Sequence, residues 1–271
     1  MKCLTLNTHS WLESDPLTKL ANLATFIHTE RVDVIALQEV NQLIATANVV
    51  NLDDFFIPIA SETVPIKQDN YAIQLIAKLK ELGDNYYWSW CYSHVGYDKY
   101  HEGVAILAKR PFVANAILVS PMDDPLNYRT RRQLIASFSD YHVLSGHYSW
   151  WTGNQLEGFQ AEWQATLNEL KNYSGKKLLA GDFNAPSNRL NESYALICQS
   201  FTDTYHEAQE QIGSATVGQT IDGWQDVTEA MRIDYVFMSS SCQVQSYRVV
   251  FDGKQQPIIS DHFGVLVDIM I

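Results

Sequence analysis

Several short apolar segments of this sequence end in a side chain that can bind a metal ion or transfer a proton. An unpaired carboxylate is costly to bury and would normally take up a proton instead. Carboxylates, carboxamides and imidazoles at the ends of buried strands therefore predict a shared polar site at one sheet edge. The residues concerned are Asn7, Glu39, His147, Asp182, Asn184, Asp234, Asp261 and His262. Oxygen ligands predominate, so the expected ion is Mg²⁺, with Mn²⁺ as the alternative, rather than structural zinc.

Each of these residues also has a simpler interpretation. The segment Asp182–Pro186 is by itself more typical of an Asx turn. A lone His147 is more often a hydrogen-bonded core or surface residue than a catalyst, and Asp234 beside Arg232 could form a plain surface ion pair. The combination is much less expected by chance than any one member, so we favour a functional site.

Strand-like and helix-like patterns surround these positions. Apolar stripes predict helices over Leu17–Ile27, Tyr71–Leu79 and Phe159–Leu170, with Gly83 and Gly175 ending the last two. Roughly ten strand-like runs, many joined by short turns, favour two packed sheets with helices outside. No repeat or Pro/Gly-rich linker divides the chain, so we expect one domain over residues 1–271. The expected strands are Cys3–Leu6, Val34–Leu37, Tyr86–Tyr92, Val104–Ala108, Leu134–Phe138, His142–Leu144, Lys177–Ala180, Ile233–Met238, Val244–Val250 and Gly264–Ile269.

The composition limits the partners and the compartment. The 271 residues include 19 Lys+Arg and 31 Asp+Glu, a net charge of −12, which argues against nucleic acid and against an anionic membrane as partners. With 46% hydrophobic residues the chain can bury a large core. There is no signal-like segment, and no C-x-x-C pair among Cys3, Cys91, Cys198 and Cys242. We therefore expect a cytoplasmic protein with reduced thiols, although two long-range disulfides remain arithmetically open.

The polar residues also occur in a familiar order. The series runs Asn7, Leu37-Gln38-Glu39-Val40, Gly146-His147, Gly181-Asp182-Phe183-Asn184, Arg232-Ile233-Asp234-Tyr235 and Ser260-Asp261-His262. It resembles the endonuclease/exonuclease/phosphatase superfamily, which has the deoxyribonuclease-I-like fold. The resemblance implies an α+β fold: a four-layer α/β/β/α sandwich of two packed, mainly antiparallel sheets flanked by helices. It also implies Mg²⁺-dependent hydrolysis of phosphoester bonds at one sheet edge.

The resemblance further implies how the ion is bound. Glu39 would be the principal metal ligand, helped by Asn7, with Asp261 in the same shell. His9 stands two residues after Asn7, where some relatives carry an acidic ligand. That departure argues against a second tightly bound metal ion.

By the same resemblance, Asp182 would hold the attacking water and Asn184 would hydrogen-bond the phosphate or that water. His262, oriented by Asp234, would donate to a phosphoryl oxygen. A second imidazole would come from His147, which we expect Glu102 to orient.

The family contains enzymes for many phosphoesters, so the substrate must be inferred from residues near the predicted site. On a strand, Arg129 and Arg131 would point together, and two guanidinium groups suit a phosphate. An ion-paired surface strand is at least as good an explanation for one of them. Trp150 and Trp151 follow His147 closely and offer stacking surfaces for sugar rings, although one could equally be core and the other packed on a helix.

A closer resemblance is to the bacterial sugar-phosphate phosphatases of this family, the maltose 6′-phosphate phosphatases. It rests on Trp150-Trp151, Glu162-Trp163, Asp222-Gly223-Trp224 and Gly96-Tyr97-Asp98. It implies a phosphomonoesterase of carbohydrate metabolism whose partner is a small-molecule sugar phosphate such as maltose 6′-phosphate. A metal-dependent phosphodiesterase, either a nuclease or a sphingomyelinase-like enzyme, is the alternative. An inactive ligand-binding module is a lesser one.

Overall fold

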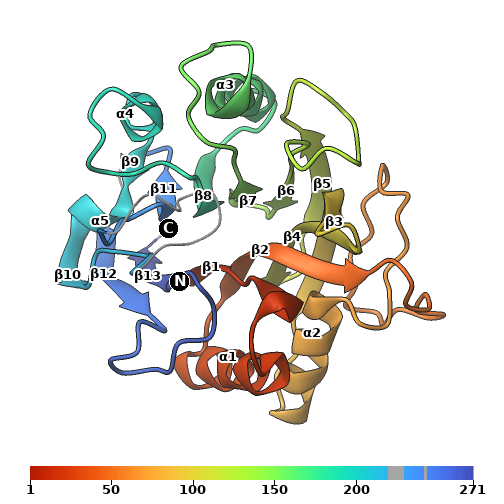
Figure 1. Cartoon of the computed structure of the whole chain (residues 1–271). Helices are drawn as coiled ribbons and strands as arrows, with labels where there is room; N and C mark the ends of the chain where they lie inside the picture. The colour runs from red at the N-terminus through yellow and green to blue at the C-terminus, as the bar shows by residue number, and fades with distance from the viewer. Residues whose placement is uncertain (219–228, 241–242, 271) are drawn as a thin grey trace.

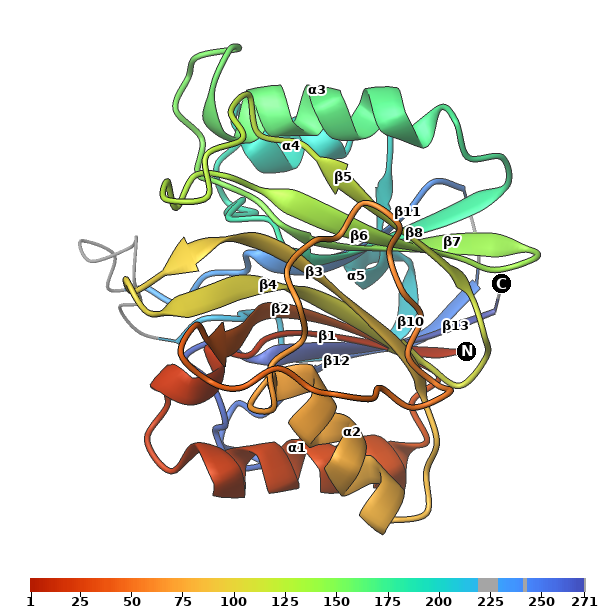
Figure 2. The ribbon, with the colours of Figure 1, turned by 90° about the vertical axis from the view of Figure 1, so that its right-hand side faces the viewer.

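Two β-sheets lie face to face in the computed structural model, which describes residues 1–218, 229–240 and 243–270. Helices α1 (Pro16–Glu30) and α2 (Tyr71–Glu81) cover the outer face of one sheet (Figure 2). Helices α3 (Gly158–Leu170) and α4 (Ser193–Ile197) cover the outer face of the other. The layers follow the order helix, sheet, sheet, helix, which confirms the α/β/β/α sandwich of the α+β class.

The sheet under α1 and α2 has seven strands in the order β10-β12-β13-β1-β2-β4-β3 (Figure 1). Within the described ranges, β1–β2 and β10–β12 are its parallel pairs, and its other pairs are antiparallel. Its strands are β1 (Lys2–Asn7), β2 (Val34–Leu43), β3 (Tyr87–Gly96), β4 (Tyr100–Ala108), β10 (Ala208–Ile212), β12 (Gln243–Val250) and β13 (Gly264–Met270).

The sheet under α3 and α4 has six strands in the order β5-β6-β7-β8-β11-β9. Strands β7 and β8 are parallel, and the other described neighbours are antiparallel. Its strands are β5 (Val113–Leu118), β6 (Arg132–Ser137), β7 (Tyr141–His147), β8 (Lys176–Asp182), β9 (Thr202–Asp203) and β11 (Asp234–Met238). The mainly antiparallel pairing expected for both sheets is confirmed.

The central strands are buried on both faces, which explains why they form nearly continuous apolar runs. In β1, Cys3 belongs to the apolar cluster between the sheets, together with Val34 and Val143. The next residue, Leu4, belongs to the cluster under α1 and α2. Trp163 of α3 packs into a third cluster on the outer face of the six-stranded sheet. These three layers of core fix the strands whose ends carry the polar residues.

The three expected helices are present, with two differences in detail. The side chain of Asn70 caps α2, and Gly83 follows that helix with a φ of 87°, as expected. Helix α3 already ends at Leu170, so Gly175 lies in the loop before β8 and does not end the helix. Leu17 is 66% exposed, so the buried face of α1 begins at Leu20.

Short or edge elements were not expected from the sequence: β5, β9, β10, α4, α5 (Thr204–Glu207) and the 3₁₀ helix η1 (Ser10–Leu12). In β5, Val113 and Leu118 are exposed while Ile117 is buried, so this edge strand lacks a continuous apolar run. The other elements are too short to produce a periodic pattern. The motif Asp222-Gly223-Trp224 lies outside the described residues.

Three cysteines can be placed, and Cys242 lies outside the described part of the chain. Cys3 and Cys91 are buried free thiols, and Cys198 is exposed and free. In the described ranges, no helix combines the length with the apolar character that spanning a bilayer requires.

Candidate active site

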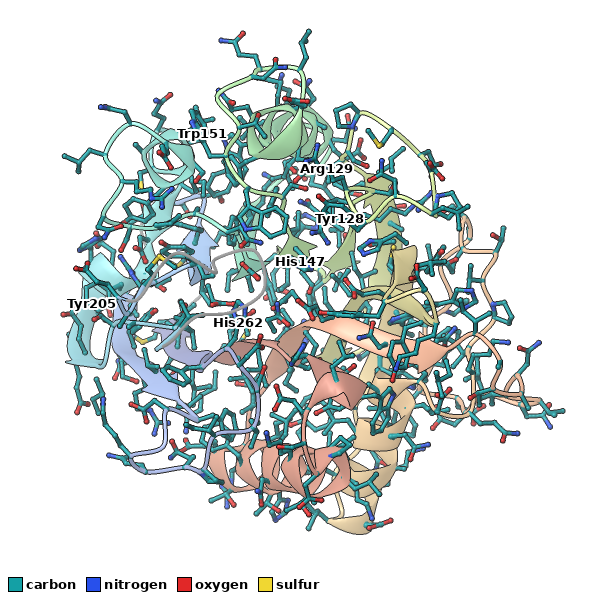
Figure 3. The ribbon with its side chains drawn as sticks, viewed as in Figure 1. Tyr128, Arg129, His147, Trp151, Tyr205 and His262 are labelled. Atoms are coloured by element: carbon teal, nitrogen blue, oxygen red, sulfur yellow. The ribbon has the colours of Figure 1, made fainter. Side chains whose placement is uncertain are left out.

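A cavity of about 240 Å³ opens near the ends of β1, β7 and β8. His147 reaches it from one sheet and His262 from the segment before β13 of the other, so the two imidazoles approach each other across the site (Figure 3). Asn7 and Asp234 lie behind the lining and hydrogen-bond to it. The expected residues that line the cavity are Glu39, Glu102, Arg131, His147, Trp150, Asp182, Asn184, Asp261 and His262. The structure brings these side chains together, and their chemical roles stay predictions.

Two glycines let β7 and β8 approach closely just before the site. Gly146 and Gly181 are register partners in this parallel pair, and the next partners are His147 and Asp182. A Cβ atom on Gly181 would lie 2.0 Å from the carbonyl oxygen of Gly146, so a side chain there would push the strands apart. Asp234 is the register partner of Asp182 on the other side. The backbone thus places His147, Asp182 and Asp234 in one row.

A β-bulge reorients the chain at Glu39. The register of β2 against β4 shifts between Leu37 and Val40, and Glu39 has a φ of 50°, in the left-handed region that favours glycine. The Nδ2 amide of Asn7 donates to Glu39 Oε1 at 2.9 Å and to Asp182 Oδ2 at 3.1 Å. One carboxamide therefore connects the expected metal ligand to the expected base.

Asp182 is a buried carboxylate with several donors. Its Oδ1 accepts the backbone N–H of Asn184 at 2.9 Å, so the Asx turn of the simpler interpretation is present within the site. Burial, followed by the nearby charge of Asp234, raises the pKa of Asp182 to about 6. A carboxylate whose pKa lies near neutral pH is suited to accept a proton from water.

His262 lies between two carboxylates. Its Nδ1 is 3.0 Å from Asp234 Oδ2, and its Nε2 is 3.8 Å from Asp182 Oδ2. Burial alone would lower the pKa of His262, but the charges of Asp234 and Asp182 outweigh it and raise the pKa well above the ordinary value. The two carboxylates therefore favour the protonated form of this buried ring. Asp234 is fully buried and pairs with it, whereas Arg232 pairs with Asp203 at 2.7 Å, so the surface ion pair between Asp234 and Arg232 is excluded.

His147 has a different neighbour from the one expected. Arg131 Nη1 lies 3.3 Å from His147 Nδ1, while Glu102 Oε1 lies 3.3 Å from His94 Nε2. Glu102 is 4.0 Å from Arg131 Nη1 and does not orient His147 directly. The prediction that Glu102 orients His147 is therefore wrong. Arg131 lies next to His147 instead, and Glu102 pairs with His94 of β3.

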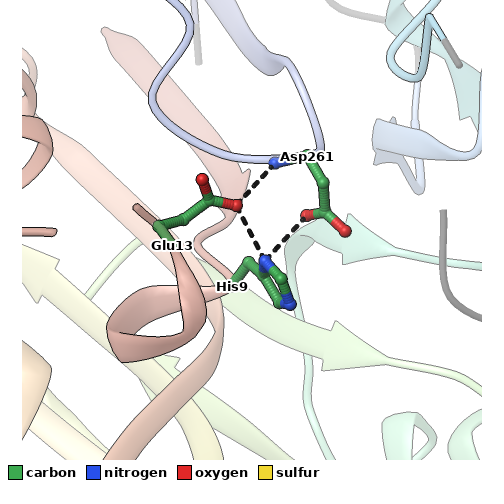
Figure 4. Close-up of side chains that lie close together, drawn as sticks. All are labelled: His9, Glu13 and Asp261. Atoms are coloured by element: carbon green, nitrogen blue, oxygen red, sulfur yellow. Dashed lines mark hydrogen bonds and ion pairs between the residues drawn. The ribbon is translucent and has the colours of Figure 1, made fainter. Parts of the chain in front are cut away.

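His9 belongs to a cluster at the rim that shares Asp261 with the expected metal site. Its Nδ1 lies 2.7 Å from Glu13 Oε1 and 3.8 Å from Asp261 Oδ1, and the backbone N–H of Asp261 donates to Glu13 (Figure 4). Ligand atoms of these three residues lie within 4.8 Å of one another. His9 lines the cavity, and the sequence pattern had marked it only as a departure from an acidic ligand.

The residues around Glu39 fit a divalent cation. Glu39 Oε2 is shielded from solvent and has no hydrogen-bond partner among the described residues. Burial, and then the charges of Glu102 and Asp261, raise the pKa of Glu39 to about 8. This excess of negative charge calls for a positive counterpart, and carboxylate and carboxamide oxygens are the ligands that Mg²⁺ prefers. Glu39 and Asp261, with the Asn7 carboxamide beside them, would hold such an ion.

Metal binding should therefore depend on pH. A raised carboxyl pKa means that the folded protein retains a proton that the unfolded chain releases, so the free energy of unfolding falls as pH rises from about 4.5 toward 8. A cation must displace this proton. We expect saturating Mg²⁺ or Mn²⁺ to raise the Tm by roughly 5 °C at pH 8 and by much less at pH 5.5, as measured by scanning calorimetry.

Two variants serve as controls for this effect. Glu39→Gln should abolish the metal-dependent rise in Tm, whereas Glu81→Gln, at an exposed side chain near the end of α2, should retain it. A rise of equal size in Glu39→Gln, or one that is independent of pH, would show that the ion binds elsewhere.

The residues expected to contact substrate separate into two groups. Trp150 lines the cavity, but Trp151 packs on the cluster under α3, away from His147 (Figure 3). Arg131 is buried at the cavity, whereas Arg129 is exposed and contacts Tyr128. The expectation that both arginines point together is wrong, because Arg129 lies in a turn and Arg131 precedes β6, so neither belongs to a strand with alternating side chains. Sequence reasoning missed Tyr128 and His94, which line the cavity and carry no motif.

Similarity to known proteins agrees with this geometry. The family model described as the Endonuclease/Exonuclease/phosphatase family matches residues 7–262. No curated protein matches the chain. A solved structure of a family member from Leptotrichia buccalis C-1013-b is 31% identical, with a TM-score of 0.85 and all of both chains covered.

Two more distant structures share the fold. A functionally unknown conserved protein from Enterococcus faecalis V583 is 17% identical, with a TM-score of 0.66 over 100% of this chain and 99% of that one. A mannosyl-6-phosphatase from Bacteroides thetaiotaomicron VPI-5482 is 16% identical, with a TM-score of 0.66 over the whole of both chains. Members of the matched family are phosphoester hydrolases that generally depend on a divalent metal ion. The match from Asn7 to His262 and the full-length similarity to the Leptotrichia protein show that this chain belongs to the endonuclease/exonuclease/phosphatase family.

Proposed function

We propose that this protein is a Mg²⁺-dependent phosphomonoesterase that removes phosphate from a small sugar phosphate such as maltose 6′-phosphate. The observation that supports hydrolysis best is the position of Asp182 at the cavity, between the imidazoles of His262 and His147 at 3.8 and 3.7 Å. A base flanked by two donors suits attack by water on an anionic phosphorus centre.

Each side chain then has one task. Asp182 accepts a proton from the attacking water. The Nε2–H group of His262 donates to a phosphoryl oxygen on which negative charge develops, and Asp234 keeps that ring protonated and oriented. Asn184 completes the contact with the water or the phosphate. A divalent ion bound by Glu39 and Asp261 would neutralise charge on the phosphoryl oxygens.

The size and lining of the cavity favour a small ester. A volume of about 240 Å³ suits a phosphate with one attached ring rather than a stretch of polymer. Tyr97, Tyr128 and Trp150 line it, and aromatic faces stack well on sugar rings. Tyr97 and Tyr128 are about half exposed, at 46% and 52%, so a second sugar ring can pack on them. The structural similarity to a mannosyl-6-phosphatase supports the same substrate class.

Electrostatics argue against a nuclease. A phosphate backbone is bound by several clustered Lys and Arg residues. The chain has a net charge of −12, and among the described residues that line the cavity the one arginine, Arg131, is buried among other side chains. We therefore propose a small-molecule phosphate ester as the partner rather than nucleic acid or a membrane.

Phosphate release from a panel of sugar phosphates tests this function. We expect Mg²⁺-dependent release, abolished by EDTA, from maltose 6′-phosphate or a related phosphorylated sugar. Supercoiled plasmid and sphingomyelin should not be cleaved. Plasmid nicking with an inert sugar panel would overturn the proposal in favour of a phosphodiesterase, and inactivity on all substrates would favour a binding module.

The aromatic rim offers a sharper test within the panel. Tyr128→Ala should raise KM for a disaccharide phosphate several-fold and leave kcat/KM for p-nitrophenyl phosphate nearly unchanged. Leu126→Ala is the matched control, because Leu126 is 81% exposed on the same loop and does not line the cavity. Equal effects of Tyr128→Ala on both substrates would argue against a sugar-binding rim.

A further inference from the structure

Arg131 is a buried arginine whose Nη1 atom lies 3.3 Å from His147 Nδ1. We propose that Arg131 is a positioning residue that holds His147 as the neutral tautomer with its proton on Nε2, the nitrogen that faces Asp182. The consequence for catalysis rests on the proposed function, whereas the tautomer itself does not.

The tautomer of His147 follows from which atoms of the pair can donate. A guanidinium group has only N–H donors and stays protonated in proteins. In a hydrogen bond with Arg131, His147 Nδ1 must therefore be the acceptor and carry a lone pair. A neutral imidazole with a lone pair on Nδ1 has its proton on Nε2. His147 Nε2 lies 3.7 Å from Asp182 Oδ2, so this N–H points into the reacting region.

The surroundings of Arg131 keep the guanidinium in place. Its Nε lies 3.5 Å from Ser149 Oγ, and its Nη1 lies 4.0 Å from Glu102 Oε1. Burial raises the pKa of Glu162, whose Oε2 accepts the backbone N–H of Ser149 at 2.8 Å, and the charge of Arg131 opposes that rise. With the Glu102 carboxylate within ion-pair distance, the arginine has a partner without substrate, so its role need not be to bind phosphate.

The neighbours of the two imidazoles therefore favour different protonation states for His262 and His147. His262 faces the carboxylate of Asp234 through Nδ1, which favours the imidazolium. His147 faces a guanidinium through the same ring atom, which excludes a proton there. The site then offers one charged donor and one neutral donor around Asp182. A carboxylate in place of Arg131 would favour a second imidazolium and place more positive charge against the base.

Nitrogen NMR of the histidine rings tests the tautomer directly. In ¹⁵N-labelled metal-free protein, long-range ¹H–¹⁵N spectra distinguish protonated from unprotonated ring nitrogens. The His147 signals are assigned by their loss in His147→Gln. We expect an unprotonated Nδ1 and a protonated Nε2 in the wild type. A proton on Nδ1 would overturn the proposal, and this result needs neither a variant nor substrate.

Variants of Arg131 test the cause. Arg131→Met removes the donor at similar length, and we expect the His147 nitrogens to shift toward the average of the two tautomers while kcat falls at least tenfold. Arg131→Lys retains a donor and should recover the wild-type tautomer and part of kcat. Arg110→Met, at an exposed ion pair with Asp140, is the control and should leave the ring signals unchanged. The His262 signals should stay fixed in all variants, which separates a local effect from misfolding.

The outcomes also separate this proposal from the proposed function. An unchanged His147 tautomer in Arg131→Met overturns the positioning role, whatever the activity. The expected tautomer shifts in a protein that hydrolyses no phosphate ester would retain the positioning role and overturn the function.

Discussion

Replacing Asp182 with asparagine is expected to lower kcat for phosphate release by at least about a hundredfold while the protein stays folded. The carboxylate is the only group of the site placed to take a proton from water between the two imidazoles, among the residues that the structure describes. Asparagine has nearly the same shape, and its Oδ1 can still accept the backbone N–H of Asn184, although its Nδ2 group would then face the Asn7 amide in place of an acceptor. It cannot accept a proton at any relevant pH.

The expected stability effect follows from the sign of the pKa shift. The pKa of Asp182 is raised to about 6, so ionising it in the folded protein is unfavourable at pH 8 and reduces the free energy of unfolding there. Asparagine removes that cost but loses the hydrogen bond that Oδ2 accepts from Asn7. Because these two effects oppose each other, Asp182→Asn should keep a cooperative melt at pH 8, with a Tm within roughly 5 °C of the wild type, while its kcat falls. Full activity in this variant would remove the base role, and the loss of a cooperative melt would point to a structural role.

Much of this site could be predicted from the chain because strand ends are marked in the sequence. Asn7, His147 and Asp182 each follow a run of apolar residues, and sheet geometry brings such ends to a common edge. The same runs predicted the central strands, since those strands are buried on both faces. Family resemblance then supplied the four-layer arrangement, which alternation of apolar residues alone does not determine.

Contacts between side chains from separate segments could not be predicted. Glu102 follows a turn and was expected to reach His147, but His94 on the neighbouring strand β3 lies closer and pairs with it. Arg129 and Arg131 have the spacing of a strand face, yet Arg129 lies exposed in a turn and Arg131 lies buried in the segment between that turn and β6. Tyr128 has no sequence signal, because its position at the cavity depends only on the path of that loop. Local sequence patterns predict helices and strands. Which side chains pair inside the site depends on the distances between residues from different helices, strands and loops, and those distances are not encoded locally.

The second large effect is expected at His262. His262→Ala should lower kcat by at least about a hundredfold, because the variant removes the charged donor closest to Asp182 and leaves Asp234 buried without its partner. That unpaired carboxylate also destabilises the fold, so a loss of activity in His262→Ala alone could reflect unfolding.

Asp234→Asn separates the two causes by a pH profile. This variant keeps the imidazole but removes the carboxylate that contributes most to its raised pKa. Since the protonated ring is the active donor, the alkaline limb of the kcat profile should lie at the high pKa of His262 in the wild type and move to lower pH in Asp234→Asn. Activity near pH 6 should then be largely retained while activity at pH 8 to 9 falls. A profile that only decreases in height, with no movement of the alkaline limb, would mean that His262 supports the fold and donates nothing to the phosphate.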